Sequence, residues 1–171
     1  LISGGHSQYL SVQNLGKYKR LGTTIDDALG EAFDKTAKLL GVEFPGGPQI
    51  EILAKKGDPE KYDLPKPIFS KGGCNLSFAG LKTAVLKISK TIKSEQDKYD
   101  LAASFQKTIE KILYKKTKIA FNEFEKINEL NEKIFVVAGG VAANKKIRSM
   151  LINLCKENNY KSIFPPIEFC G

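Results

Sequence analysis

The sequence contains little cysteine, histidine or arginine, and each shortage excludes a kind of site. Its three cysteines are odd in number and form no Cys-x-x-Cys pair, so neither a disulfide framework nor a zinc knuckle is expected. A reducing cytosol fits this cysteine usage best. Because His6 is the only histidine, a histidine-based metal site cannot be assembled from this segment alone.

Long apolar runs and terminal signals are also missing. No run approaches the ~20 apolar residues of a membrane span, so we expect no membrane partner. No signal-peptide pattern is expected at the start. Leu1 lies in what reads as the middle of a strand, and Met150 is the only methionine. We therefore expect a piece of a longer protein.

Positive charge is what the sequence has in excess. The formal net charge is +8, and lysine supplies nearly all of it, with arginine only at Arg20 and Arg148. Lysines near phosphates gain from counterion release, which favours a nucleic-acid partner. Arginine is the better residue for bidentate contacts to bases and phosphates, however, and a compositional bias toward lysine and asparagine explains the charge equally well.

The first part of the chain predicts a hairpin and a helix. SQYLSVQ and YKRL alternate as strands do and flank Asn14-Leu15-Gly16-Lys17, a good hairpin turn. A helix follows, for which Thr24 and Asp27 can supply the N-terminal cap and Gly41 the stop.

Proline and glycine interrupt the next segment, residues 45–97, which predicts an inserted helical subdomain with short helices near 49–56 and 81–93. An apolar stripe then predicts a longer helix from Asp100 to about Phe124. Its members are Leu101, Phe105, Ile109, Ile112 and Ile119.

The last part predicts a strand over 134–138, a helix over 144–157 and a strand over 162–164. Antiparallel strands, helices and a strand-helix-strand unit together predict a mixed α/β domain. Residues 1–44 and 98–171 would form one half of this domain, and residues 45–97 the insertion.

Two glycine turns follow predicted strands, at Ser3-Gly4-Gly5 and at Gly139-Gly140. Glycine there can serve packing or positive φ alone. Alternatively, a nucleotide lies against the bare backbone, where amides at a helix start can meet it. Neither turn has the full spacing of a P-loop or of a Gly-x-Gly-x-x-Gly motif.

Carboxylates recur at helical spacing on the predicted first helix, at Asp27, Glu31 and Asp34. Glu31 with Lys35, and Asp34 with Lys38, are i,i+4 pairs that a solvated helix face explains. A functional interpretation has Asp34 accept hydrogen bonds from ribose hydroxyls, as acidic residues do in other nucleotide sites.

Several segments, taken in chain order, resemble the TsaD family, once called glycoprotease-like proteins. They are LISGGHSQ, TIDDALGEAFDKTAKLLGVEFPGGP, LSFAGLKTAV, ASFQ and VVAGGVAAN followed by FPPIEFC. The resemblance covers essentially the whole chain. It implies the α/β fold of actin, sugar kinases and chaperone ATPases, a mixed sheet flanked by helices.

The resemblance implies site residues as well. The family's substrate-contacting strand and turn, around the phosphate and acyl end of an adenylate, match Leu1, Ile2, Ser3, Gly4 and Gly5. The positions that hold the nucleotide's sugar match Asp34 and Gly47, and the adenine-side position matches Asn144. No residue is assigned as a catalytic base.

The implied activity is transfer of a threonylcarbamoyl group from threonylcarbamoyl-adenylate to the tRNA adenosine beside the anticodon. The implied partners are this adenylate, tRNA and the other subunits of the transfer complex, in the cytoplasm. The family's divalent metal ion, iron or zinc, polarises the transferred group. Its ligands are expected before Leu1 and after Gly171, so no metal ligand is expected within this sequence.

Two other functions remain open. The chain can be a noncatalytic module that binds an adenine nucleotide or serves as a scaffold, or a sugar or acid kinase of the same fold. A protease role, suggested by the family's old name, has no nucleophile or metal pair here to support it.

Overall fold

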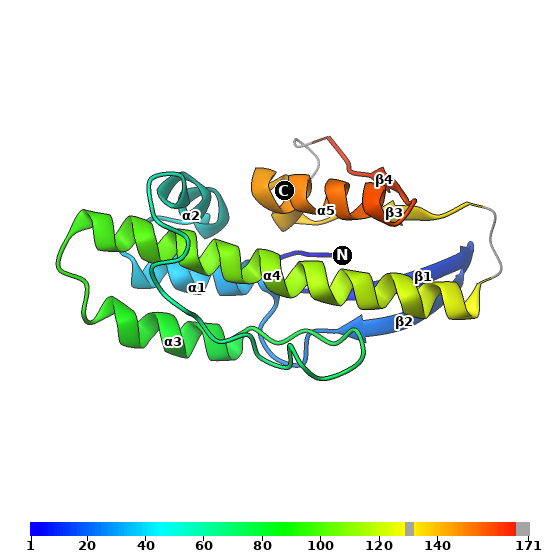
Figure 1. Ribbon diagram of the computed structural model, residues 1–171, viewed down its shortest axis with the longest axis horizontal. Helices are drawn as coiled ribbons and strands as arrows, with labels where there is room; N and C mark the ends of the chain where they lie inside the picture. Colours follow the sequence, from blue (N-terminus) through cyan, green and yellow to red (C-terminus); the bar gives the residue numbers. More distant parts are fainter. Residues whose placement is uncertain (129–131, 167–171) are drawn as a thin grey trace.

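The computed structural model describes residues 1–128 and 132–166 (Figure 1). It confirms a mixed α/β chain, in which a hairpin and four helices precede a strand-helix-strand unit. In chain order the elements are β1 (Gln8–Asn14), β2 (Lys17–Thr23), α1 (Leu29–Leu39), α2 (Gly46–Ala54), α3 (Ala79–Ser89), α4 (Glu95–Ile127), β3 (Ile134–Val136), the 3-10 turn η1 (Gly140–Ala143), α5 (Lys145–Glu157) and β4 (Lys161–Ile163).

The predicted hairpin is confirmed. β1 and β2 pair antiparallel, with Gln8 opposite Thr23. At the turn, Gly16 has a φ of +76°, which glycine adopts without steric cost. The Asn14 side chain accepts a hydrogen bond from the Leu15 N–H at 2.7 Å, a local bond that asparagine favours in turns.

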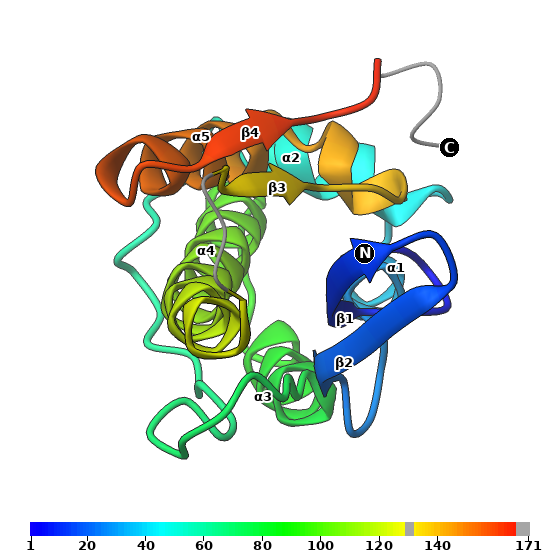
Figure 2. The same cartoon turned by 90° about the vertical axis from the view of Figure 1, so that its right-hand side faces the viewer.

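The strand-helix-strand unit is confirmed too. β3 pairs in parallel with β4, with Ile134 opposite Lys161, and α5 connects them. Figure 2 shows β3 and β4 across the top of the molecule, with β1 and β2 at the right and α4 at the left. In the described residues the strands thus form two separate two-stranded sheets.

The first residues of the chain join these two sheets. The Ile2 N–H donates to the Ala138 carbonyl at 2.8 Å, and the Val141 N–H donates to the Ile2 carbonyl at 3.2 Å. On the other side, the Gln8 N–H donates to the Leu1 carbonyl at 2.9 Å. Ile2 precedes the first glycine turn, and Ala138 and Val141 flank the second. These hydrogen bonds therefore bring the two predicted glycine turns close together.

The start of α1 differs from the prediction. Ala28 occupies the N-cap position, and Thr24 donates its hydroxyl to the Asp27 carbonyl instead of capping the helix. The Ser7 hydroxyl, beside β1, accepts from the Leu29 N–H at 2.8 Å. The predicted cap was therefore wrong, because the acceptor comes from a residue distant in sequence.

The long helix α4 begins at Glu95, earlier than the predicted Asp100, because Ser94 and Asp97 form a capping box. Four members of its predicted stripe are buried in the core, namely Leu101, Phe105, Ile109 and Ile112, whereas Ile119 is only partly buried and lies outside the core cluster. Phe105 meets Phe33 of α1 edge-on at 5.2 Å between ring centroids. Within the described residues, no helix is long and apolar enough to cross a membrane.

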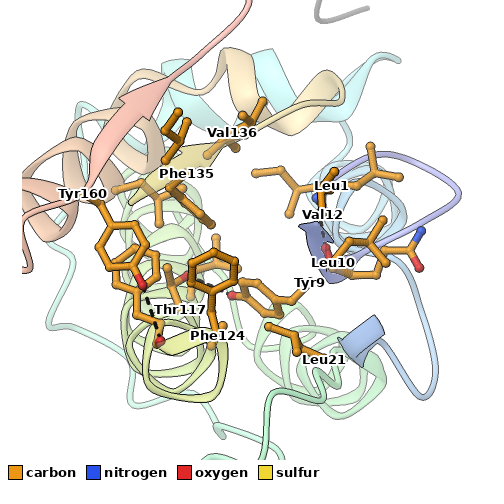
Figure 3. A pocket seen from close by; sticks show the side chains of 18 of the residues that line it. Leu1, Tyr9, Leu10, Val12, Leu21, Thr117, Phe124, Phe135, Val136 and Tyr160 are labelled. Atoms are coloured by element: carbon orange, nitrogen blue, oxygen red, sulfur yellow. Dashed lines mark hydrogen bonds between the residues drawn. The ribbon is translucent and has the colours of Figure 1, made fainter. Parts of the chain in front are cut away.

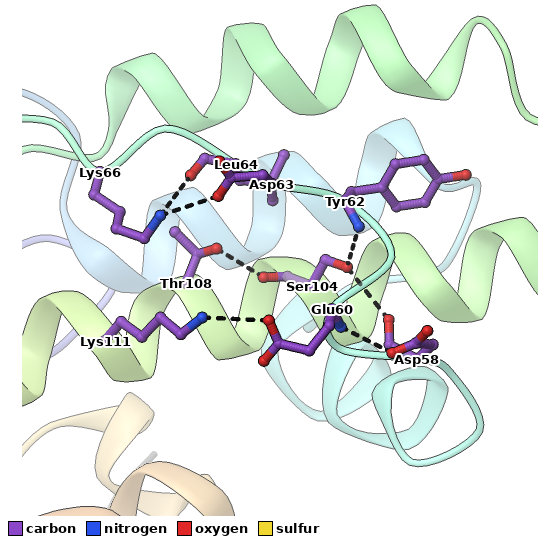
Figure 4. A network of polar contacts seen from close by, with 9 residues as sticks. All are labelled: Asp58, Glu60, Tyr62, Asp63, Leu64, Lys66, Ser104, Thr108 and Lys111. Atoms are coloured by element: carbon purple, nitrogen blue, oxygen red, sulfur yellow. Dashed lines mark hydrogen bonds and ion pairs between the residues drawn. The ribbon is translucent and has the colours of Figure 1, made fainter.

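The segment 45–97 is tied to α4 by polar contacts (Figure 4). The Asp58 N–H donates to the buried Asp100 carboxylate at 2.8 Å, and the Tyr62 N–H donates to the Ser104 hydroxyl at 3.1 Å. Leu64 of this segment belongs to the same apolar cluster as the α1 and α4 side chains. The division into residues 1–44 with 98–171 and residues 45–97 stays a prediction.

Candidate functional site

A cavity of about 530 Å³ lies where the first glycine turn, α1, the start of α2 and the start of α5 meet. Its lining residues are Gly4, Gly30, Phe33, Asp34, Phe44, Pro45, Gly47, Pro48, Glu51, Gly140, Val141, Ala143, Asn144 and Lys145. The fold therefore brings Gly4, Asp34, Gly47 and Asn144, all predicted as site residues, to one cavity. We call it the glycine cavity.

The other predicted site residues lie elsewhere. Leu1 and Ile2 line a second, apolar cavity, and Ser3 and Gly5 line neither of the two. The Ser3 hydroxyl is used within its own turn, where it accepts from the His6 N–H at 3.0 Å. The segment 1–5 thus runs from the second cavity, at Leu1 and Ile2, to the glycine cavity, at Gly4.

Asp34 lies on the half-buried face of α1. Its Oδ1 accepts a hydrogen bond from the Gly46 N–H, in the first turn of α2, at 2.8 Å. The predicted Asp34–Lys38 pair was wrong: no ion pair joins these two residues in the described part of the chain, because the carboxylate faces α2. Asp34 therefore fixes the position of α2 at the cavity wall.

The predicted Glu31–Lys35 pair is confirmed, at 2.6 Å. Lys35 also contacts Asp27 at 2.7 Å. The hydrogen bonds to Asp27 and then Glu31 raise the pKa of Lys35, and the bond from Lys35 lowers the pKa of Glu31. Glu31 and Lys35 thus form a pair on the solvent-facing side of α1, as predicted, whereas Asp27 precedes the helix and its side chain is only 18% exposed.

Glycine at the cavity wall has no steric explanation at Gly4 or Gly47. A Cβ built on either residue meets no atom within 4 Å, and neither has a positive φ. Gly5 is equally open. Packing does not require a bare backbone at these positions, and at Gly4 and Gly47 a side chain would only occupy space next to the cavity.

Glycine is structurally required at Gly46, next to Gly47, and at Gly139, next to Gly140. A Cβ on Gly46 would lie 2.6 Å from the Ala37 Cβ. Gly139 has a φ of +103°, and its Cβ would lie 2.4 Å from the Ile2 carbonyl oxygen. In the second predicted turn, packing and the positive φ thus explain why residue 139 is glycine. Gly140 instead lines the cavity.

Asn144 is buried and caps α5. Its Oδ1 accepts from the Ile147 N–H at 3.0 Å, and its Nδ2 donates to Oε1 of Gln106 on α4 at 2.9 Å. Both ends of the amide are held, one by the helix that it caps and one by α4.

Glu51 and Phe44 are cavity residues that sequence reasoning missed. The Glu51 carboxylate accepts from the Lys145 N–H at 3.1 Å and so links α2 to the start of α5. Phe44 also lines the cavity, although the residue is 83% exposed. Glu51 comes one helical turn after Gly47, a spacing that could have indicated a shared face.

The glycine cavity suits a ligand with both a polar and an apolar part. The first turns of α2 and α5 border it, and the partial positive charge of a helix N-terminus favours anions. The N–H groups of Gly46, Lys145 and Ile147 in these turns already donate to the side chains of Asp34, Glu51 and Asn144. Asp34 supplies an acceptor and Asn144 an amide, while Phe33 and Val141 supply apolar wall.

The second cavity, also about 530 Å³, has a different chemistry (Figure 3). Side chains such as Leu1, Val12, Phe124 and Val136 line it. Its Tyr9 hydroxyl is bonded to Thr117 at 2.9 Å, and burial raises the pKa of this phenol. The wall offers few groups for a phosphate, so the glycine cavity is the better candidate.

A metal site is not found among the described residues. No group of three or more His, Cys, Asp or Glu side chains is placed to hold an ion in residues 1–128 and 132–166. Cys170 and Gly171 lie outside the described residues. The residues of this chain that are described do not fit the metal that the resemblance implies.

The chain is similar to transferases that modify tRNA. Residues 1–171 match the family described as TsaD, tRNA N6-adenosine threonylcarbamoyltransferase, and the chain belongs to that family. The expected family membership is confirmed.

Curated relatives carry the same name. The tRNA N6-adenosine threonylcarbamoyltransferase of Pelagibacter ubique is 80% identical over 171 residues, which are 100% of this chain and 48% of the relative. The Rickettsia conorii protein is 54% identical over 173 residues, with 99% of this chain and 50% of the relative covered. The chain spans about half the length of the curated relatives it matches.

Proposed function

We propose that the full-length protein transfers a threonylcarbamoyl group from threonylcarbamoyl-adenylate to the tRNA adenosine beside the anticodon. We also propose that the glycine cavity holds the AMP half of the adenylate. One observation carries this proposal: residues far apart in sequence, Gly4, Asp34, Gly47 and Asn144, line one cavity of about 530 Å³. Such a volume is in the usual range for small-ligand sites, roughly 300–1,000 Å³.

Each cavity residue has a proposed task. The Asp34 carboxylate accepts hydrogen bonds from the ribose hydroxyls, and Asn144 contacts the adenine. Gly4 and Gly47 leave room for the sugar and phosphate, because a Cβ at either would project into open space. Leu1, Ile2, Ser3 and Gly5 belong to the strand and turn that face the phosphate and acyl end.

In this proposal the chain contributes to the rate by position and charge. The nucleotide is held while the tRNA amine attacks the threonylcarbamoyl carbonyl and AMP leaves. The helix N-termini stabilise negative charge on the phosphate. The divalent ion that the family implies, iron or zinc, has no site in the described residues, so no step is assigned to it here.

The remaining expectations follow from the family. They are the fold of actin, sugar kinases and chaperone ATPases for the full-length protein, a cytoplasmic location, and assembly with the other subunits of the transfer complex. The net charge of +8 is compatible with tRNA as the acceptor.

The test uses the full-length protein with its partner subunits, unmodified tRNA, and threonylcarbamoyl-adenylate labelled in the threonine. We expect label in tRNA, and saturable AMP binding in calorimetry. Binding of AMP without transfer would support the noncatalytic module instead. ATP-dependent phosphorylation of a sugar or acid would support the kinase, and the absence of both transfer and AMP binding would overturn the proposal.

A further inference from the structure

Gln106 is a buried polar residue on the apolar side of α4. The residue is only 5% exposed, and its Oε1 accepts from Asn144 Nδ2 at 2.9 Å. Other buried polar residues of α4 bond differently: Thr108 donates to the carbonyl of Ser104 in its own helix, at 2.8 Å. Gln106 instead reaches a residue of the glycine cavity, far away in sequence.

The contacts of Asn144 determine which way its amide points. The Ile147 N–H can only donate, so the atom facing it must be Oδ1, at 3.0 Å. Nδ2 therefore faces Gln106, whose oxygen accepts. If the Asn144 amide turned over, two N–H groups would oppose each other at Ile147. The helix N–H and the Gln106 oxygen thus hold one amide orientation from both ends.

A fixed amide presents a defined pattern to the cavity. After these two bonds, Nδ2 of Asn144 keeps one N–H and Oδ1 keeps one lone pair. A donor beside an acceptor matches the edge of adenine, which offers an N–H₂ donor next to a ring-nitrogen acceptor. Guanine offers two acceptors on the corresponding edge, so an amide with one donor and one acceptor matches it poorly.

We propose that Gln106 is a positioning residue that holds the Asn144 amide in the orientation that selects adenine over guanine. This inference rests on the proposed function, because it assumes that the base lies against Asn144. Gln106 itself need not touch the nucleotide, since it is absent from the cavity lining. It acts through one hydrogen bond, from the opposite side of Asn144.

The test measures AMP and GMP binding to the full-length protein by calorimetry, for wild type, Gln106→Met and Gln106→Glu. Methionine keeps the length and removes the acceptor, whereas glutamate retains an acceptor for Asn144 Nδ2. We expect wild type to prefer AMP by about tenfold or more. Gln106→Met should lose most of that preference through weaker AMP binding, and Gln106→Glu should retain it.

Thr108→Val is the matched control. It removes one buried hydrogen bond from the same helix, with no contact to Asn144. We expect it to lower the melting temperature much as Gln106→Met does, without changing the ratio of AMP to GMP affinity. If Gln106→Met does not fold, Gln106→Asn replaces it, because an amide shorter by one CH₂ cannot reach Asn144.

The possible outcomes separate the two proposals. If wild type prefers AMP and Gln106→Met keeps the same preference, the positioning role is overturned and the proposed function stands. An equal loss of preference in Thr108→Val would also overturn it, because general destabilisation would then explain the effect. If wild type binds neither nucleotide, the proposed function is overturned and the positioning role with it.

Discussion

The carboxylate of Asp34 accepts a hydrogen bond from the backbone N–H of Gly46 at 2.8 Å. This bond joins the middle of α1 to the first turn of α2, where helix N–H groups lack partners within the helix. Asp34 therefore has a structural task in addition to the proposed contact with ribose. In the described residues no hydrogen bond is found to its Oδ2, so that atom is the one proposed to meet the sugar.

The two tasks of Asp34 can be separated by substitution. Asp34→Asn keeps an oxygen for the Gly46 N–H, whereas Asp34→Ala removes it. We expect Asp34→Ala to lower the stability of the full-length protein by about 1 kcal/mol, as loss of a helix cap does, and Asp34→Asn to change it little. Both should weaken AMP binding, because neither side chain carries a carboxylate for the ribose. Denaturant unfolding and calorimetry measure these effects, and normal AMP binding by Asp34→Asn would contradict the ribose contact.

Gly46 and Gly47, adjacent in the first turn of α2, give opposite predictions. A Cβ at Gly46 would lie 2.6 Å from the Ala37 Cβ, so Gly46→Ala should destabilise the protein by about 1–3 kcal/mol. A Cβ at Gly47 meets nothing within 4 Å, so Gly47→Ala should leave stability unchanged or slightly higher. Its cost should instead be about a tenfold loss of AMP affinity, or about 1.4 kcal/mol.

The pair is its own control, because both changes add the same methyl group to the same helix turn. Thermal melting reports the first effect and calorimetry with AMP the second. If Gly47→Ala bound AMP like wild type, the ligand would not lie against this glycine, and its lack of a side chain would need another explanation.

Local sequence patterns predicted most of the helices and strands. They did not predict the cavity, whose residues were indicated only by the family resemblance. The hairpin turn at Gly16 and the stripe of α4 are set by neighbours in sequence, so they could be predicted from short segments. The meeting of Asp34 with Gly46, and of Asn144 with Gln106, depends on how helices pack. No spacing rule indicates such contacts.

Lys116 shows the same limit. It lies one turn after Ile112 on the apolar stripe of α4 and is fully buried, although lysine is normally a surface residue. Its Nζ donates to the carbonyls of Lys71 at 2.9 Å and Gly73 at 3.1 Å, and burial lowers its pKa. Its spacing from Ile112 can be read from the sequence, but the loop that accepts its hydrogen bonds cannot.

The hydrogen bond between Tyr9 of β1 and Thr117 of α4 supports a third prediction (Figure 3). It spans 2.9 Å at the wall of the apolar cavity and ties the hairpin to the long helix. Tyr9→Phe and Thr117→Val should each destabilise the full-length protein by about 1 kcal/mol, and the double variant by clearly less than the sum. Denaturant unfolding of the four proteins measures the coupling.

Additive losses would mean that this bond contributes no pairwise stability. Tyr18→Phe is the control, because Tyr18 is exposed and loss of its hydroxyl should leave stability unchanged.

The ion pair between Glu125 and Lys133 predicts a dependence of stability on pH. Lys133 lies 2.8 Å from the carboxylate, and the Tyr160 hydroxyl donates to it at 3.1 Å. The bond from Lys133, followed by that from Tyr160, lowers the pKa of Glu125 below its ordinary value. The folded state then binds the proton more weakly than the unfolded chain. The stabilisation is therefore present above the unfolded pKa of about 4.3 and is lost as pH falls through the folded pKa.

Glu125→Gln should therefore lower stability at pH 7 by up to about 1 kcal/mol, since the pair is partly exposed, and by progressively less in acid. Denaturant unfolding between neutral and acid pH checks this, with Glu123→Gln, at an exposed pair with Lys126, as the control. A loss of equal size at every pH would show that the effect comes from packing and not from the charge of Glu125.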